Sequence, residues 1–219
     1  MGSYFGMRKI ALGKDEKGIT RPMLNGKFVF QVGPLDQGFW PDGIYTAPTD
    51  EALRWDIETM KKQGCNCVRK HLEVEPSRWY YWCDKLGLMV WQDMPSANAY
   101  QDRIDREKGV PVDKPQYKAE LISMVRNNWN HPSIIMWVVF NEEQGQHDTE
   151  ALTAEVKGLD PSRLVNPASS NGRDGMPFET KSGDVIDAHA YPGPYSPEPT
   201  AERAAVLGEF GGLSLPVQG

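Results

Sequence analysis

The sequence predicts an α/β fold whose simplest architecture is a TIM-type (β/α)8 barrel that is incomplete. Strand-like and helix-like segments alternate along most of the chain, as they do where parallel strands are joined by helical crossovers. Residues 134–140 form an almost continuous apolar run, which is typical of a strand buried on both faces of a parallel sheet. Seven strands can be recognised, whereas a full barrel has eight. An open, doubly wound sheet is the alternative architecture.

Three strands and two helices are predicted in the first half of the chain. The strands are expected over residues 27–32, 65–72 and 88–93. The first helix begins after Thr49, a residue type that caps helix N-termini, and ends at Gly64. The second helix begins at Pro76, since proline suits the first helical turn, and ends at Gly87.

The second half is predicted to contain four strands but only two clear helices. The strands are expected over 134–140, 164–168, 185–190 and 204–209, and the helices over 115–130 and 149–159. Segments 169–184 and 192–203 are rich in Gly, Pro, Ser and Asp, so the helices after the fifth and sixth strands are expected to be short or absent. Residues 96–113 are expected to form a long surface loop.

The composition argues against several classes of protein. The chain has 24 Lys and Arg against 30 Asp and Glu, a net charge of −6, which argues against nucleic acid or an anionic membrane as the main partner. No stretch approaches the roughly 20 apolar residues of a membrane helix, and the first residues do not resemble a signal peptide, so the cellular location is left open. The three Cys lack metal-binding spacing and no nucleotide-binding glycine loop is present, so neither a metal nor a cofactor is expected.

The candidate functional residues are polar and aromatic side chains at the C-terminal ends of the predicted strands, where barrel enzymes place their active sites. In chain order they are Asp36, Arg69, His71, Trp91, Asp93, Asn141, Glu142, Tyr191 and Glu209. Two carboxylates facing one mouth suit glycoside hydrolysis, which needs a proton donor and a second carboxylate that attacks the anomeric carbon or activates water. Repulsion and burial would keep one carboxyl protonated, while Arg69 or a hydrogen bond keeps the other ionised. On this pattern alone, purely structural ion pairs remain the alternative.

One run of residues carries a specific family resemblance. The segment NHPSIIMW at 130–137, followed by Asn141 and Glu142, resembles the catalytic barrel of glycoside hydrolase family 2, which contains β-galactosidases, β-glucuronidases and β-mannosidases. Further segments agree with this resemblance along nearly the whole chain, namely RPMLNGKFVF, NCVRKH, LMVWQDMPS, LDPSRLV and LGEFGG. The resemblance implies a retaining exo-β-glycosidase, most similar to a β-galactosidase, that acts on carbohydrate without a cofactor.

The resemblance also implies roles for individual residues. Glu142 matches the general acid/base and Glu209 the nucleophile, while Asn141 would hydrogen-bond the 2-hydroxyl of the sugar. Arg69 matches an arginine near the nucleophile, and Tyr191 matches a tyrosine beside it. Further sugar contacts are expected from Asp36, His71, Trp91 and Asp93.

Several of these roles have alternatives in the sequence. Glu143 competes with its neighbour for the part of the acid, because strand alternation does not decide between consecutive residues at a strand end. Arg69 could serve only as a structural partner of a buried carboxylate. His71 and His189 suit buried, hydrogen-bonded imidazoles as well as sugar contacts, and Trp91 suits the core as well as stacking on a sugar ring.

The chain departs from the family pattern at both ends. Residues 1–20, which include a strand-like piece over 3–12, are expected to lead in from a missing upstream domain, and residues 21–219 form a barrel domain truncated at its C-terminus. The first and seventh strands would then face a gap with unpaired backbone groups, so we expect self-association through this open edge or association with missing domains. A carbohydrate-binding barrel without turnover, and an inactive fragment of a longer enzyme, are the alternative functions.

Overall fold

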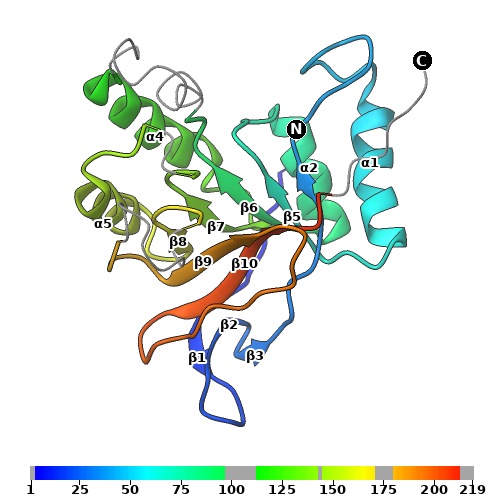
Figure 1. The fold of residues 1–219 in the computed structure, drawn as a ribbon. Coiled ribbons are helices and arrows are strands. Elements are labelled where there is room, and N and C mark those ends of the chain that lie inside the picture. The colour runs from blue at the N-terminus through cyan, green and yellow to red at the C-terminus, as the bar shows by residue number, and fades with distance from the viewer. Residues whose placement is uncertain (1–2, 97–111, 143–144, 171–179, 213–219) are drawn as a thin grey trace.

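The structure is a computed structural model that describes residues 3–96, 112–142, 145–170 and 180–212. Parallel strands form its centre, helices cover their outer side, and a small antiparallel sheet lies at one end (Figure 1). In chain order the elements are β1 (Ile10–Lys14), β2 (Thr20–Leu24), β3 (Lys27–Phe28), β4 (Leu35–Asp36), α1 (Asp50–Lys62), β5 (Cys67–Lys70), α2 (Ser77–Leu86), β6 (Met89–Asp93), α4 (Lys114–Asn128), β7 (Ile134–Val138), α5 (Thr149–Leu159), β8 (Leu164–Asn166), β9 (Val185–Ala190) and β10 (Ala204–Phe210).

The parallel strands follow one another around an incomplete barrel. Five of them pair in the order β4-β5-β6-β7-β8, and β9 pairs with β10 in a second parallel sheet. The two sheets are linked where the backbone N–H of Asp184, at the start of β9, donates to the carbonyl of Val165 in β8 over 2.8 Å. Within the residues that the structure describes, no ladder joins β10 back to β4, so the barrel stays open there.

Local sequence signals set the helix ends as predicted. Thr49 caps α1, because its hydroxyl accepts a hydrogen bond from the backbone N–H of Ala52 over 3.1 Å. Gly87 ends α2 in the left-handed conformation at φ 72°, which favours glycine. Residues 180–184 and 192–203 contain no helix, as expected from their composition. Residues 171–179 of the first of these segments and residues 97–111 of the predicted loop lie outside the described residues.

Two apolar cores lie on the two faces of the parallel sheet. Trp79 and Trp137 belong to the core between the sheet and the helices, whereas Met136 and Val138 belong to the core inside the barrel. β7 supplies residues to both cores, and all of its side chains are buried, which confirms the expectation from the apolar run 134–140. In the described part of the chain, no helix is long and apolar enough to cross a lipid bilayer.

The predicted strand over 27–32 is wrong in its extent and its partner. Its first two residues, Lys27 and Phe28, form β3, which pairs with β2 across a tight turn at Asn25 and Gly26. Both turn residues have positive φ, 52° and 78°, as two-residue hairpins require. Pairing with β5 starts later, where the carbonyl of Val32 accepts hydrogen bonds from Asn66 and Cys67, and continues into β4.

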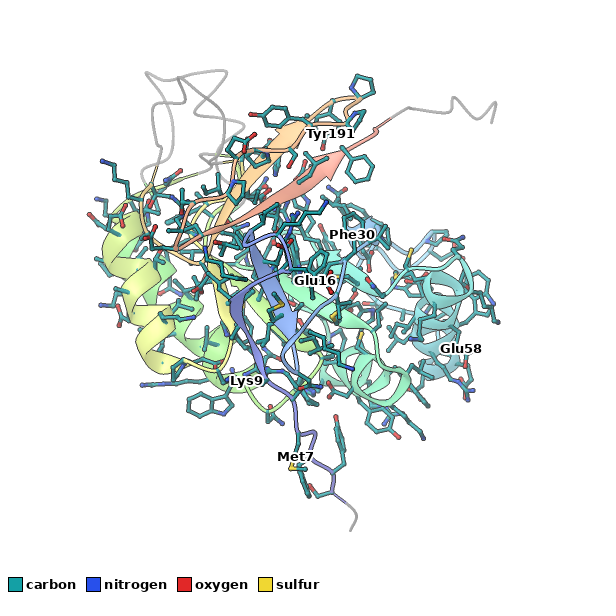
Figure 2. The ribbon with its side chains drawn as sticks, turned by 90° about the horizontal axis from the view of Figure 1, so that it is seen from below. Met7, Lys9, Glu16, Phe30, Glu58 and Tyr191 are labelled. Carbon is teal, nitrogen blue, oxygen red and sulfur yellow. The ribbon has the colours of Figure 1, made fainter. Side chains whose placement is uncertain are left out.

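The start of the chain is folded onto the end of the barrel where the parallel strands begin. β1 pairs antiparallel with β2, so the hairpin spans the predicted boundary after residue 20. The Arg8 guanidinium donates to the carbonyls of Pro132, Ile134 and Ser162 over 2.9–3.1 Å, at the starts of β7 and β8. In the view from below, the segment that carries Lys9 and Glu16 crosses the middle of the molecule (Figure 2). This antiparallel sheet therefore covers the inner core from below.

A cavity of about 410 Å³ marks the open side of the barrel. It lies between β10 and the segment leading into β4, and Arg69 and Trp91 form part of its inner wall. Phe28, Phe30 and Val32 line it and are more than two-fifths exposed. The open edge predicted from the sequence is thus bordered by apolar side chains.

Candidate active site

Arg69 is the centre of the candidate site. It points into the barrel from β5 and is 4% exposed. Its guanidinium donates to both carboxylate oxygens of Asp93 over 3.0 and 2.8 Å, to Oε1 of Glu209 over 3.0 Å and to Oδ1 of Asn141 over 2.8 Å. Burial alone would lower the pKa of Arg69, but the negative charges of Asp93, Asp187 and Glu209 outweigh it and raise the pKa. One permanently charged group therefore joins β5, β6, β7 and β10.

Glu209 is a buried carboxylate surrounded by donors. Besides Arg69, the hydroxyl of Tyr191 donates to its Oε2, and Nε2 of His71 lies 3.5 Å from Oε1. Burial, and next the hydrogen bond to Glu209, raise the pKa of Tyr191, so its hydroxyl keeps its proton. These contacts fix the orientation of the Glu209 carboxylate.

A β-bulge directs Glu209 into this cluster. The register between β10 and β9 shifts between Leu207 and Glu209, and Gly208 occupies the shift. The backbone N–H of Gly208 donates to Oδ1 of Asp187 over 2.7 Å, and a Cβ at this position would lie 2.4 Å from both carboxylate oxygens of Asp187. The close approach of the two chains therefore requires glycine immediately before Glu209.

Glu142 enters the same space from the end of β7. Its backbone has φ 45°, in the left-handed region, and its N–H donates to the carbonyl of Ser169 over 3.1 Å. This bend breaks the strand alternation, so Asn141 and Glu142 both reach the site although they are consecutive. The side chain of Glu142 is 26% exposed, and its Oε1 lies 2.9 Å from Nδ1 of His189. Glu143 lies outside the described residues.

The two carboxylates open on a common space. One carboxylate oxygen of Glu142, one of Glu209 and one ring nitrogen of His189 all lie within 4.8 Å of one another. This set of atoms could in principle hold a cation. Each side chain, however, already has a protein partner, since Arg69 and Tyr191 bind Glu209 and His189 bridges to Glu142. The geometry fits a hydrogen-bonded cluster of acids and bases.

His71 lies beside Glu209 with a defined tautomer. The side-chain amide of Gln37 lies 3.0 Å from Nδ1 of His71, and because an amide N–H donates, this nitrogen is the acceptor. Nε2 then carries the hydrogen and faces Glu209. Burial lowers the pKa of His71, and the charge of Arg69 adds to this effect, whereas Asp93 and Glu209 oppose it. A neutral imidazole therefore presents an N–H to the carboxylate.

Two of the residues predicted from the sequence do not contact this cluster. Asp36 pairs in register with Lys70, which points toward the helices, and its carboxylate accepts from the buried Lys70 ammonium over 2.8 Å. Alternate strand residues face opposite sides of a sheet, which is why Asp36 lies away from Arg69. Trp91 lies inside the barrel but is 7% exposed, and its indole N–H donates to Gln31 over 2.6 Å. Its ring is core, the alternative that the sequence left open.

Sequence reasoning missed two residues behind His189, namely Ser169 and Asp187. The Ser169 hydroxyl lies 2.7 Å from Nε2 of His189 and donates to Asp187 over 2.6 Å. A signal for Asp187 was present, because period-two alternation places it on the same face of β9 as His189. Ser169 follows the short strand β8, in a segment with no periodic pattern, and offered no such signal.

The comparisons with known proteins place the chain in a family. A family model described as "Glycosyl hydrolases family 2, TIM barrel domain" matches residues 46–202. The fold and the site thus define a barrel domain of the glycoside hydrolases, and the chain belongs to glycosyl hydrolase family 2. Glu209 lies beyond the matched range, so its placement in the site comes from the structure.

Individual relatives give the same picture. The chain is similar to a β-galactosidase of Lactococcus lactis, with 32% identity over 83% of this chain and 17% of that protein. It is also similar to the large subunit of a β-galactosidase of Leuconostoc lactis, with 35% identity over 74% of this chain and 26% of that subunit. A putative β-glucuronidase of Formosa agariphila is 29% identical over 78% of this chain and 16% of that protein.

The solved structures share the fold. A GH2 β-galacturonidase from Eisenbergiella tayi bound to galacturonate superposes with a TM-score of 0.69 at 22% identity, over 86% of this chain and 33% of that one. The Parabacteroides merdae β-glucuronidase gives 0.65 at 24% identity, over 83% of this chain and 22% of that one. The chain thus spans between about a sixth and a third of the lengths of these proteins.

Proposed function

We propose that this chain carries the catalytic centre of a retaining exo-β-glycosidase, with Glu142 as the general acid/base and Glu209 as the nucleophile. The observation that supports this most is the approach of the two carboxylates, whose nearest oxygens lie within 4.8 Å across a common space. Retaining enzymes place the two groups about 5–5.5 Å apart, whereas inverting enzymes need roughly 6.5–9.5 Å to admit a water molecule. The separation therefore favours direct attack by a carboxylate.

The environments of the two carboxylates suit these different roles. Glu209 accepts hydrogen bonds from Arg69 and the Tyr191 hydroxyl, and Nε2 of His71 lies 3.5 Å away, so its carboxylate is oriented for attack on the anomeric carbon. Glu142 is more exposed, where a leaving group can reach it, and its Oε1 lies 2.9 Å from Nδ1 of His189. In the first step Glu142 gives its proton to the glycosidic oxygen while Glu209 bonds to the anomeric carbon, so the glycosidic C–O bond breaks and the leaving group departs as an alcohol. In the second step Glu142 takes a proton from a water molecule that attacks the anomeric carbon, so the bond to Glu209 breaks and the sugar is released.

Asn141 is suited to the 2-hydroxyl of the sugar. Arg69 donates to its Oδ1, which fixes the orientation of the amide and leaves the NH2 group as the donor toward substrate. Such a bond strengthens as positive charge develops on the sugar ring. Asp93 is 1% exposed and holds Arg69 with both oxygens, so we assign it to positioning of the guanidinium. We leave Asp36 and Trp91 out of the proposed sugar site.

We infer a β-galactoside as the substrate, because the two relatives described above with at least 30% identity are named as β-galactosidases. A panel of nitrophenyl glycosides, assayed with this chain, tests this choice. Turnover of the β-galactoside well above the β-glucuronide and the β-mannoside is the expected result. The reverse order would assign a different sugar to the same mechanism.

The nucleophile is tested by trapping and by substitution. A 2-deoxy-2-fluoro galactoside with an activated leaving group should label Glu209, as read by mass spectrometry of proteolytic peptides. Glu209→Gln should abolish turnover, and Glu142→Gln should slow substrates with poor leaving groups far more than activated ones. Label on another residue, or an active Glu209→Gln variant, would refute the assignment. Calorimetric binding of galactose without turnover or labelling would favour the carbohydrate-binding alternative. Activity only after addition of further segments of a longer enzyme would favour the alternative of an inactive fragment.

We further propose that the open side of the barrel takes part in association, either between copies of this chain or with additional domains. The support is the apolar lining of the cavity between β10 and β4, together with strand edges that lack a ladder in the described part of the chain. Sedimentation should show self-association that Phe30→Glu weakens, since Phe30 is 72% exposed. A stable monomer across a wide range of concentrations would argue against association between copies.

A further inference from the structure

We propose that Ser169 and Asp187 are positioning residues that fix the tautomer of His189. In this tautomer Nδ1 of His189 accepts a hydrogen bond from the protonated carboxyl group of Glu142. This inference rests on the proposed role of Glu142 as general acid. Four side chains form a continuous line of hydrogen bonds, from Asp187 through Ser169 and His189 to Glu142, with spacings of 2.6, 2.7 and 2.9 Å. The first three are buried, and only Glu142 reaches the open space of the site.

The direction of the line is set at its buried end. Asp187 is 0% exposed, and its carboxylate also accepts from the Asn166 amide over 2.7 Å and from the Gly208 N–H over 2.7 Å. These two partners are N–H groups that can only donate, so both carboxylate oxygens of Asp187 act as acceptors. Ser169 has one hydroxyl hydrogen, and the 2.6 Å contact places it on the bond to Asp187.

The state of His189 follows from that hydrogen. Because Ser169 uses its only hydrogen on Asp187, its oxygen acts as the acceptor toward Nε2 of His189, and Nε2 therefore carries a hydrogen. Four of the five guanidinium hydrogens of Arg69 bind Glu209, Asp93 and Asn141. The fifth, on Nη1, makes a longer contact of 3.3 Å with Nε2, which the 2.7 Å contact with Ser169 outweighs. In the neutral ring Nδ1 then has a lone pair, and its nearest partner is Oε1 of Glu142.

A lone pair on Nδ1 matches the protonation that the first step requires. It stabilises the acid form of Glu142 by accepting a hydrogen bond from the protonated carboxyl group. Once that proton has left, the lone pair of Nδ1 and the negative carboxylate repel each other. The second step, in which Glu142 takes a proton from water, restores the hydrogen bond. The other charged and titratable groups around this pair are Arg69, His71, Tyr191 and Glu209. The negative charge of Glu209, whose Oε2 lies 3.4 Å from Nδ1, acts in the same sense, and Arg69 opposes it.

Nuclear magnetic resonance of the histidine rings tests the tautomer without any need for turnover. The full chain labelled with nitrogen-15 contains four histidines, and loss of one signal set in His189→Gln assigns the ring. We expect the Nε2–H tautomer for His189 in the parent, a mixed or Nδ1–H state in Ser169→Ala, and the parent state in Ser169→Thr, which keeps the hydroxyl. Ser133→Ala is the matched control, because it removes a buried hydroxyl at the start of β7, outside this line of hydrogen bonds. An Nδ1–H ring in the parent, or an unchanged ring in Ser169→Ala, overturns the proposal.

The leaving-group dependence of kcat/KM provides the kinetic test. General acid catalysis contributes roughly 10²–10⁴-fold, so Ser169→Ala should lose at least about tenfold on phenyl glycosides. Dinitrophenyl glycosides need little proton assistance and should change much less, and the alkaline limb of the pH profile should move to lower pH. Equal losses on both substrates would mean a merely structural role and would overturn the proposal. If Glu142→Gln shows strong leaving-group dependence and Ser169→Ala does not, the proposed role of Ser169 is refuted and the proposed function stands. If Glu142→Gln shows none, the proposed function fails, and the ring signals still decide the tautomer.

Discussion

Replacing Arg69 by Met removes the charge that holds the site together while keeping much of the side-chain volume. The substitution leaves Asp93, which is 1% exposed, and Glu209, which is 8% exposed, without their buried cation. Removing one partner of a buried ion pair costs about 3–5 kcal/mol, because the remaining charge is neither solvated nor paired. Since two carboxylates are left, we expect the free energy of unfolding to fall by an amount near the upper end of this range.

Urea unfolding followed by tryptophan fluorescence measures this loss. With a slope of about 2 kcal/mol per molar urea, a loss of about 5 kcal/mol lowers the midpoint by about 2.5 M. Arg126→Met is the control, because Arg126 lies exposed on α4, and it should change stability by less than about 0.5 kcal/mol. Adding Asp93→Asn to Arg69→Met should recover part of the loss by removing one unpaired charge. A loss below about 1 kcal/mol in Arg69→Met would refute the argument that desolvated charges dominate here.

Three further predictions follow from single contacts. Gly208→Ala places a Cβ 2.4 Å from the Asp187 carboxylate, so it should destabilise the chain by about 1–3 kcal/mol and reduce turnover. A melting temperature and a rate equal to those of the parent would show that the bulge tolerates a side chain. Tyr191→Phe removes a hydrogen bond to a charged group, worth roughly 1.5–3 kcal/mol, so kcat should fall about tenfold or more. An unchanged kcat would exclude a role for the hydroxyl. Burial raises the pKa of Glu73 to about 7, so its protonated form is favoured in the folded state, and the stability that this provides is lost as the pH rises through 7. Glu73→Gln should therefore stabilise the chain more at pH 8 than at pH 5 in urea titrations, and equal effects at both values would contradict the shift.

The helix ends and most strands were predictable because each depends on local chemistry. The Thr49 cap, the left-handed Gly87 and the apolar run 134–140 act within a few residues, and the structure places them as the sequence indicates. The strand predicted at 27–32 was wrong because the Asn25–Gly26 turn draws Lys27 and Phe28 into a hairpin. The alternating pattern of that segment does not indicate whether it joins the antiparallel sheet of β1 to β3 or the parallel sheet that begins with β4.

The site was partly predictable for a similar reason. Side chains at the ends of long strands, such as Arg69, Tyr191 and Glu209, meet because parallel strands end at the same edge. Asp36 was misplaced because β4 has two residues, and the register that sets it against Lys70 has no local signature. The contact between Ser169 and His189 joins two strands through a nonperiodic segment, so only the tertiary structure reveals it.

The antiparallel sheet at the start of the chain can dock onto the barrel only after the segment before β10 has been synthesised. The hydroxyl of Thr20 donates to the carbonyl of Thr200, and the Lys14 ammonium donates to the carbonyl of Ala201 over 3.1 Å, just ahead of β10. Contacts between residues that are far apart in the sequence form late and slow folding, because a long loop must close before they contribute. The hairpin of β1 and β2 can therefore make these contacts only after the ribosome has synthesised and released the segment that leads into β10. Trimming that hairpin would loosen β10 from below and disturb the glutamate at its other end.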